Sequence, residues 1–438
     1  MASGTTPSAP ILLAPYGDPS KEPPTLTNAA GTTACRSGCG PMDWNPAVLL
    51  RIVGSHVVVQ GVRFVGVTDL REEGCADQGV GNHTGVWFEG SPDSIGSKNE
   101  LLDSDFTGLS RGVVVGSSAR QTRIRGNTFR NNSMMLVLDG AQFNDGGAVG
   151  IQLQGNDNEI DGNRFSGQDG CSYDYLRDGS AVEVWGSASG NHIHHNRAFD
   201  NESFVELGKP GEAEPPTDNT VAYNVVVGTR TEGDGQAFLT TRGAASRYGP
   251  VHRTLVVNNS VHMPGSRARG IVCDSGCSSQ TLTAANNIIW SDGDGTEGHH
   301  GAIICDGACT ERTNLVWSGD STPHVRIDGE VDPGRALGTG SLVADPRWLA
   351  PEQGDLRLQA GSPAIDAGTL LSGQAYDVDL AGETVPAGAQ VDMGAFEGAL
   401  EAGQRRVPPA RAARAAVPGP DRWDSVATIF RVRRRAGL

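Results

Sequence analysis

Short apolar segments alternate with polar turns along most of the chain, and one turn pattern recurs. An apolar residue, two variable residues and an asparagine end at Asn127, Asn163, Asn196, Asn224 and Asn258, which follow one another at intervals of 28 to 36 residues. Weaker copies surround Ser104, Asn287 and Asn314. A repeat of this length is typical of a solenoid, because one unit cannot bury its apolar face without a neighbour.

A second short strand lies between successive asparagines, and its middle residue varies freely between two small or apolar ones. Its copies are Val86–Phe88, Val113–Val115, Leu136–Leu138, Ile151–Leu153, Val182–Val184, Val205–Leu207, Ala237–Leu239, Ile271–Cys273 and Ile303–Cys305. Alternation with period two predicts one buried face, so the middle residue should point outward. We therefore predict an all-β fold, a parallel β-helix of roughly nine to eleven coils, with asparagines stacked in a hydrogen-bonded ladder. Unrelated strands of a β-sandwich are the alternative.

The repeat and the composition divide the chain into four parts. We expect an N-terminal coil or cap over 1–48, the β-helix over 49–330, a C-terminal cap region over 331–400 and a disordered basic tail over 401–438. The tail holds nine arginines against three acidic residues, whereas the whole chain carries a net charge of −16. An acidic body argues against a nucleic-acid partner. It also means that a polyuronate substrate would need a local basic patch or a bridging cation.

The cysteines bear on the compartment. Six of the eight form the C-x-x-x-C pairs Cys35/Cys39, Cys273/Cys277 and Cys305/Cys309. This pattern favours disulfides and an oxidising environment, with zinc binding as the alternative. The sequence contains no apolar run long enough to span a membrane, and its first residues lack signal-peptide features. We expect an extracellular or cell-surface protein, monomeric and without a transmembrane segment.

The outward positions of the second strand carry the candidate chemistry. In stacking order they are Trp87, Val114, Val137, Gln152, Glu183, Glu206, Phe238, Val272 and Ile304. Parallel strands stack about 4.8 Å apart, so Glu183 and Glu206 should protrude side by side, with Gln152 one coil before. Two such carboxylates repel, which predicts a bound cation or one carboxyl kept protonated for acid catalysis. The alternative is a solvated charged strip.

Longer segments resemble a known superfamily. Residues from about 50 to 320, with the opening segments 8–16 and 57–64, resemble the pectate-lyase-like superfamily of right-handed parallel β-helices. The segments 361–368 and 391–397 are similar to the terminal cap of its bacterial members. The resemblance implies a right-handed solenoid and a polysaccharide as substrate or ligand.

Two local similarities concern chemistry. The segments 178–185 and 200–208 resemble the calcium motif of family nine pectate lyases, which implies Ca²⁺ as a cofactor and the ligands Asp178, Glu183, Asp200 and Glu202. Glu206 stands where that family has its catalytic lysine, and Lys209 is the nearby substitute. A weaker similarity of 206–209 and 239–243 to family six alginate and chondroitin lyases implies Lys209 as base and Arg242 as acid.

We therefore predict a secreted, polysaccharide-active protein, a cation-assisted lyase of an acidic polysaccharide. Its catalytic candidates are Glu183, Glu206, Lys209 and Arg242, and its substrate-binding candidates are Gln152, Trp185 and Arg247, with the indole stacking on a sugar ring. One alternative is a retaining glycoside hydrolase with Glu183 and Glu206 as acid and nucleophile. The others are a non-catalytic carbohydrate-binding solenoid and a uronate epimerase.

Overall fold

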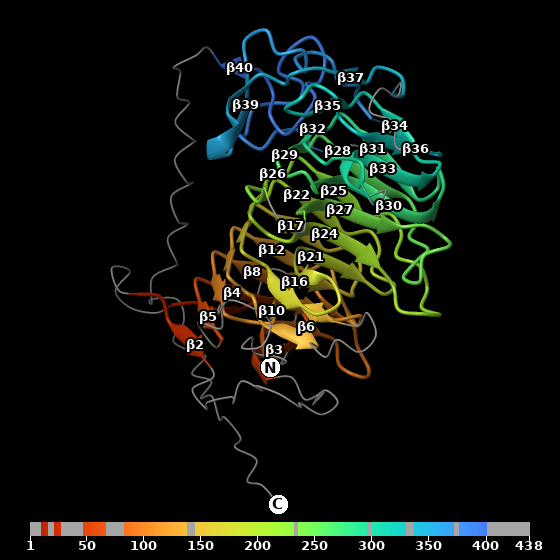
Figure 1. Ribbon diagram of the computed structural model, residues 1–438. Helices are drawn as coiled ribbons and strands as arrows, with labels where there is room; N and C mark the ends of the chain where they lie inside the picture. Colours follow the sequence, from red (N-terminus) through yellow and green to blue (C-terminus); the bar gives the residue numbers. More distant parts are fainter. Residues whose placement is uncertain are drawn as a thin grey trace, which may run out of the picture. The chain divides into compact units, whose positions relative to one another are not determined.

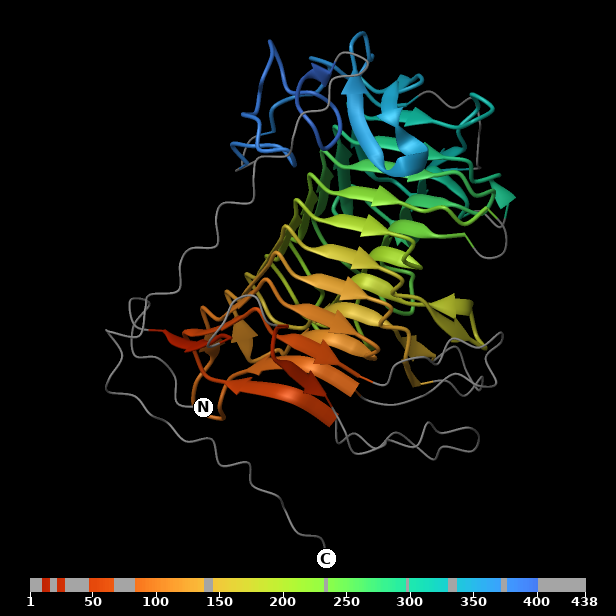
Figure 2. The same ribbon diagram turned by 90° about the vertical axis from the view of Figure 1, so that its left-hand side faces the viewer.

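The computed structural model describes residues 10–15, 22–27, 47–66, 83–137, 145–231, 235–296, 299–329, 337–371 and 376–400. The basic tail and the Cys35/Cys39 pair lie outside these ranges. In the described part, the chain winds through three long parallel sheets that stack coil upon coil (Figures 1 and 2). This is the predicted right-handed parallel β-helix, with ten or eleven strands in each long sheet.

Each coil contributes one strand to each long sheet, in a fixed order. Sheet I contains β1 (Ile11–Leu13), β4 (Val57–Gln60), β8 (Glu100–Leu102), β12 (Arg123–Arg125), β17 (Glu159–Asp161), β22 (His192–His194), β25 (Thr220–Ala222), β28 (Thr254–Val257), β31 (Leu282–Ala285) and β34 (Thr310–Arg312). Sheet II contains β2 (Thr25–Thr27), β5 (Arg63–Val65), β9 (Asp105–Thr107), β13 (Thr128–Arg130), β18 (Arg164–Ser166), β23 (Arg197–Phe199), β26 (Val225–Val227), β29 (Ser260–Met263), β32 (Ile288–Ser291), β35 (Leu315–Trp317) and β37 (Leu342–Val343).

Sheet III is the one that carries the candidate site. It contains β3 (Ala47–Val53), β6 (His83–Glu89), β10 (Arg111–Val115), β16 (Val149–Leu153), β21 (Ser180–Trp185), β24 (Ser203–Gly208), β27 (Ala237–Arg242), β30 (Arg269–Cys277), β33 (Gly301–Gly307) and β36 (Val325–Ile327). Its strands pair in parallel from coil to coil.

Smaller elements decorate the coils. Two-stranded sheets form from β7 (Gly96–Ser97) with β11 (Ala119–Arg120), β14 (Met135–Val137) with β15 (Gly146–Gly147), and β19 (Gly170–Ser172) with β20 (Leu176–Asp178). Near the C-terminal end lie β38 (Trp348–Ala350), the 3₁₀ turn η3 (Pro351–Gln353), β39 (Asp355–Gln359) and β40 (Ala399–Leu400). In the described part of the chain, no helix has the length and apolar character needed to cross a bilayer.

Buried polar side chains form ladders at all three corners of the coil. Between sheets I and II the amide oxygen of each residue accepts a backbone N–H from the preceding coil, through Asn127, Asn163, Asn196, Asn224, Asn259, Asn287 and Asn314. The predicted ladder is confirmed, but Asn258 was the wrong member, since its neighbour Asn259 occupies the position. Asn258 instead donates to the Asp392 carbonyl. Shorter ladders, which the sequence did not reveal, run through Asn158, Asn191 and Asn219 and through Asn132, Gln168 and Asn201.

Large aromatic side chains fill the core from sheet II in some coils and from sheet III in others. Rings of successive coils stack in sheet II with centroids 4.7, 4.7 and 4.9 Å apart, from Phe64 through Phe106 and Phe129 to Phe165. Glycine stands opposite in sheet III, because a Cβ at Gly112 would lie 2.7 Å from the Phe129 ring. In the coil after Phe165, the equivalent residue of sheet II is the small Ala198. There and in the next coil, the buried rings of Phe204 and Phe238, both from sheet III, occupy the core instead. The aromatic core side chains thus come from sheet II in the earlier coils and from sheet III in the later ones.

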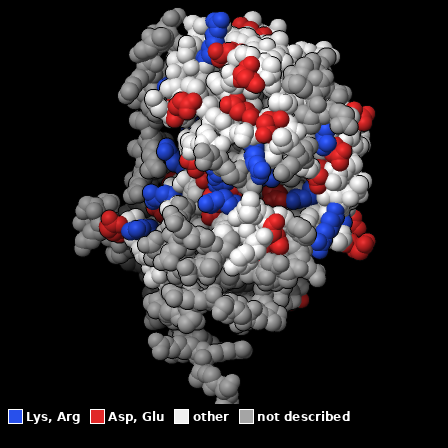
Figure 3. Space-filling view, in the orientation of Figure 1, with Lys and Arg blue, Asp and Glu red and all other residues white. Residues whose placement is uncertain are grey.

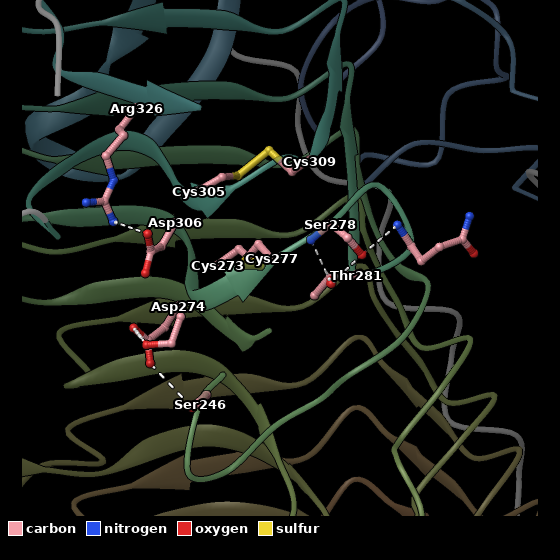
Figure 4. Close-up of a disulfide and its surroundings, with 12 residues drawn as sticks. Ser246, Cys273, Asp274, Cys277, Ser278, Thr281, Cys305, Asp306, Cys309 and Arg326 are labelled. Atoms are coloured by element: carbon pink, nitrogen blue, oxygen red, sulfur yellow. Dashed lines mark hydrogen bonds and ion pairs between the residues drawn. A yellow bond between two sulfur atoms is a disulfide. The ribbon is translucent and has the colours of Figure 1, made fainter. Parts of the chain in front are cut away.

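The segment after 344 packs on the outer face of sheet II. Its apolar side chains, which include Trp348, Leu356, Leu358, Met393 and Phe396, contact Val225, Val227, Ile288 and Leu315. Two of the predicted disulfides, Cys273–Cys277 and Cys305–Cys309, are present on successive coils at β30 and β33 (Figure 4). Cys171 is also disulfide-bonded. The disulfide interpretation is thus confirmed for these pairs over the zinc alternative.

Candidate functional site

Three polar side chains stand in a row on neighbouring strands of sheet III. Gln152 of β16 pairs in register with Glu183 of β21, and Glu183 pairs with Glu206 of β24. This is the predicted juxtaposition, and it is confirmed. The core side of the same strands is apolar, because Val182, Val184, Val205 and Leu207 are fully buried. Period-two alternation therefore directs the row outward.

Two members of the predicted outward series were wrong. Phe238 lies inside, fully buried and stacked on Phe204, and Thr240 takes the position beside Glu206. The strand β27 is therefore placed two residues away from the alignment drawn from sequence, and the Phe238 ring stacks on Phe204 in the core. Val137 belongs to β14, which pairs antiparallel with β15 outside the long sheets. Val114 is thus the residue that precedes Gln152 in sheet III.

Glu183 is held by neutral and distant partners. Its carboxyl accepts a 2.6 Å hydrogen bond from the Gln152 amide, whose oxygen accepts one of 2.9 Å from the Arg111 guanidinium. Burial raises the pKa of Glu183 to about 7, and the charge of Glu206 adds to this, against the opposing effects of Gln152, Arg111 and Arg242. Near neutral pH a large fraction of Glu183 is therefore protonated.

Glu206 has a cationic partner instead. The Arg242 guanidinium at the end of β27 forms an ion pair with its carboxylate and donates a 2.7 Å hydrogen bond to the Leu207 carbonyl. The two glutamates thus differ in environment although they are neighbours in one sheet. Such a pair, with one carboxyl favoured in the acid form and the other paired with a cation, is a common basis for acid and base roles.

Aromatic side chains flank the row at the C-terminal ends of the strands. The ring centroids of Trp185 and Tyr248 lie 5.6 Å apart, and the Arg247 guanidinium lies 5.4 Å from the Tyr248 centroid. Gly208 permits this approach, because a Cβ there would lie 2.8 Å from the Trp185 ring. The predicted Trp185 and Arg247 therefore both contact Tyr248 beside the row. Tyr248 was missed, since it lies in a loop outside the repeat pattern.

Asp178 also lies next to the two glutamates. It is half-buried, and its carboxylate accepts a 2.8 Å hydrogen bond from the Gly179 backbone. Burial raises its pKa well above the ordinary value, and the charges of Glu206 and Glu183 raise it further. Asp178, Glu183 and Glu206 therefore lie close to one another. Asp178 and Glu183 are two of the four predicted calcium ligands.

The other two predicted ligands have partners of their own. Glu202, only 4% exposed, forms ion pairs of 2.6 Å with Arg230 and 3.1 Å with Arg269. Asp200 accepts hydrogen bonds of 2.7 and 2.9 Å from the Thr229 backbone and hydroxyl, at the rim of a depression of about 440 Å³. That depression lies at the corner between sheets II and III, away from Glu183. In the ranges the structure covers, no group of three or more His, Cys, Asp or Glu side chains is arranged to hold a metal ion, and calcium binding stays a prediction.

Lys209, the predicted proton acceptor, follows directly after β24. Its side chain is 7% exposed, and its ammonium donates to the Gly211 carbonyl. Its backbone N–H donates a 2.9 Å hydrogen bond to the Tyr248 carbonyl, which holds the loop after β27 against β24. Lys209 thus helps to shape the aromatic side of the site, and its catalytic role stays a prediction.

Comparison with known proteins finds similarity to one family model and to several solved structures. The family model of NosD, described as a periplasmic copper-binding protein, matches residues 58–234, fewer than half of the chain. No curated protein matches. The tailspike protein of E. coli bacteriophage HK620 in complex with a pentasaccharide is similar at 14% identity, over 62% of this chain and 56% of the tailspike, with a TM-score of 0.37. A double mutant of that tailspike matches at 13% identity, over 67% and 60% of the two chains, with a TM-score of 0.36.

This chain therefore covers little more than half the length of the tailspike chains. The match to NosD begins in the second coil and ends after the strand that carries Glu206. It thus spans coils that carry the asparagine ladder and all three parallel sheets. The stacked parallel sheets, together with this match, make the described part of the chain a right-handed parallel β-helix.

Proposed function

We propose that this chain is a polysaccharide-active β-helix protein that hydrolyses glycosidic bonds at the row of Gln152, Glu183 and Glu206. The observation that carries the proposal is the pairing of two glutamates on adjacent strands with unlike partners, an amide for Glu183 and a guanidinium for Glu206. Strands about 4.8 Å apart suit the carboxyl separation of about 5 to 5.5 Å found in retaining glycosidases.

The roles follow from the two environments. Glu183, with a pKa raised to about 7, donates its proton to the glycosidic oxygen as the bond to the anomeric carbon breaks. Glu206 attacks that carbon and forms a glycosyl ester. Water then attacks the anomeric carbon and gives its proton to Glu183, while the bond from that carbon to the Glu206 oxygen breaks, which releases the sugar and restores both carboxyls. Arg242 holds the Glu206 carboxylate in place between turnovers.

A lyase is the second candidate, and the Arg242 guanidinium is the feature that favours it. A guanidinium beside the scissile sugar could neutralise a uronate carboxylate and acidify the neighbouring C–H, with a calcium ion on Asp178 and Glu183 assisting. Hydrolysis is the better fit, because Arg242 is engaged by Glu206 and the Lys209 ammonium by the Gly211 carbonyl.

The test compares two products on one set of substrates. The protein is incubated with xylan, laminarin, galactomannan, polygalacturonate and alginate, with and without calcium. Hydrolysis releases reducing ends alone, whereas elimination also produces absorbance at about 235 nm from the unsaturated uronate. Glu183→Gln and Glu206→Gln should abolish reducing ends, and the exposed Glu352→Gln should not. Product that absorbs near this wavelength would show elimination and contradict hydrolysis. Binding without any product would indicate a non-catalytic carbohydrate-binding solenoid.

We also propose a location outside the cytoplasm. The disulfides at β30 and β33 support it, because such bonds persist in oxidising compartments. The similarity to a family described as periplasmic agrees with it. Labelling of free thiols in protein taken directly from its source cells tests this, since reduced Cys273 and Cys305 would contradict it.

A further inference from the structure

A hairpin beside the row exposes apolar side chains. Strands β19 and β20 form the antiparallel hairpin, with Ser172 opposite Leu176, and it projects from the coils as the yellow hairpin of Figure 2. Tyr173 is 54% exposed, Tyr175 40% and Leu176 64%. Apolar groups clustered on a soluble surface mark a place where a ligand binds.

The exposed tip of the hairpin is held in one conformation. The Asp145 carboxylate accepts hydrogen bonds of 2.8 Å from the Ser172 hydroxyl, 2.8 Å from the Tyr173 backbone and 3.2 Å from the Asp174 backbone. At the base, Cys171 is disulfide-bonded, and Arg177 forms a 2.7 Å ion pair with Asp169. The aromatic side chains are therefore presented on a fixed support, which lowers the entropic cost of binding.

The hairpin leads directly into the site. Strand β20 ends at Asp178, which shares its environment with Glu183 and Glu206. The Tyr175 phenol lies within electrostatic range of Tyr248 and Glu206, and burial raises its pKa. Tyr248 in turn contacts Trp185. Aromatic rings thus lie around the carboxyl pair, and the faces of sugar rings stack on such side chains.

The charges favour a neutral ligand. Acidic and basic side chains are interleaved on the face over β21 and β24, without a field of one sign (Figure 3). Arg242 is paired with Glu206, and Arg177 with Asp169. A polyuronate would bring a carboxylate with every sugar towards Asp178 and the glutamates, and like charges at this distance repel.

We infer that the β19–β20 hairpin and the Trp185–Tyr248 pair form an aromatic platform that binds the sugar rings of a neutral polysaccharide next to Glu183 and Glu206. The inference rests on the proposed function for its substrate, but it concerns binding, which is measurable without turnover. The rings bind through their faces, so the phenol hydroxyls of Tyr173 and Tyr175 are dispensable while the rings are not.

Affinity electrophoresis tests the platform with the full chain. The protein is run through native gels that contain xylan, laminarin or galactomannan, and through gels with polygalacturonate or alginate. At least one neutral polysaccharide should retard it, and the acidic ones should retard it less. Tyr173→Ala and Tyr175→Ala should each weaken the apparent affinity about three- to tenfold, as expected for loss of one stacked ring. Tyr173→Phe and Tyr175→Phe should retain it.

The matched control is Leu370→Ala, which removes an equally exposed apolar side chain, 66% exposed, from the C-terminal segment and should change nothing. The platform would be contradicted if the alanine variants were retarded as strongly as the wild type. It would also be contradicted if only acidic polysaccharides retarded the protein, or if no gel did. Glu183→Gln separates the two proposals, because it should keep the retardation and lose the reducing ends. If ring removal weakens binding while the wild type releases no reducing ends, hydrolysis fails and the platform stands.

Discussion

Glu183 and Glu202 are both acidic residues on the middle coils of sheet III, and the structure treats them in opposite ways. Glu202 lies just before β24, nearly inaccessible, between the guanidinium groups of Arg230 and Arg269. Glu183 lies mid-strand in β21, half-buried, with an amide as its direct partner and Glu206 as its neighbour. Burial raises the pKa of both and two guanidinium groups oppose the rise at each, but those of Glu202 form direct ion pairs with its carboxylate.

The difference separates a stabilising group from a reactive one. Removing one member of a buried ion network leaves a charge without compensation, so Glu202 is expected to matter for folding. Glu183 gains little from its ionised form in the folded protein, so its environment costs stability and supplies a carboxyl that titrates near neutral pH. The following variants test this contrast, from the largest expected effect to the smallest.

Glu183→Gln should lower the rate of glycosidic bond cleavage by a factor of about 10² to 10⁴, the usual contribution of a general acid. The amide keeps the size of the side chain but cannot deliver a proton, so binding should persist. Initial rates of reducing-end release check this, with Glu352→Gln as the control. A variant that keeps more than half of the activity would exclude the acid role.

Glu202→Ala should destabilise the fold by about 3 to 5 kcal/mol, because Arg230 and Arg269 lose a buried counter-charge. Activity per folded molecule should stay near the wild-type value at low temperature. Guanidinium unfolding followed by circular dichroism measures the loss, and Glu352→Ala, at an exposed position, should shift stability by less than about 0.5 kcal/mol. An equally large loss in Glu183→Ala would remove the contrast between the two glutamates.

The dependence of stability on pH should differ between wild type and Glu183→Gln. The folded pKa of Glu183 is about 7 and the ordinary value is 4.5, so the folded state holds the proton more tightly than the unfolded chain. The stabilisation by protonation is complete below the ordinary value and is lost as the pH rises through 7. We expect a slope of at most about 1.4 kcal/mol per pH unit within this window, absent in the variant. Parallel curves of unfolding free energy against pH would contradict the raised pKa.

Arg242→Gln should shift the pH profile of catalysis by less than about one unit. Arg242 lowers the pKa of Glu183, so its removal should move the alkaline limb of the profile to higher pH while the rate falls. Arg269→Gln is the matched control, because it removes a guanidinium from Glu202 instead, and it should leave the limb in place. A limb that moves equally in both variants would indicate a general charge effect.

Much of the fold followed from local patterns. The repeated asparagine and the strand with one apolar face predicted the solenoid, the ladder and the row from Gln152 to Glu206, because period two and coil length are properties of consecutive residues. The errors arose where the packing of side chains, and not the repeat pattern, decided which residue occupies a position. Asn258 and Asn259 are adjacent asparagines, and Phe238 is an apolar residue in an outward slot of a plausible alignment. Only the packing of neighbouring coils distinguishes such alternatives.

The sequence by itself determined that the chain is a stack of coils and that Gln152, Glu183 and Glu206 stand in register on neighbouring strands, because both follow from a short repeat. Only the tertiary structure decided which acidic and basic side chains form ion pairs. Arg242 reaches Glu206 from 36 residues later, and Arg269 reaches Glu202 from 67 residues later, through loops whose lengths differ from coil to coil. The asymmetry between the two glutamates, and the aromatic hairpin beside them, depend on those loop paths. No pattern within a coil encodes them, since an ion pair is set by distance in space and not by spacing along the chain.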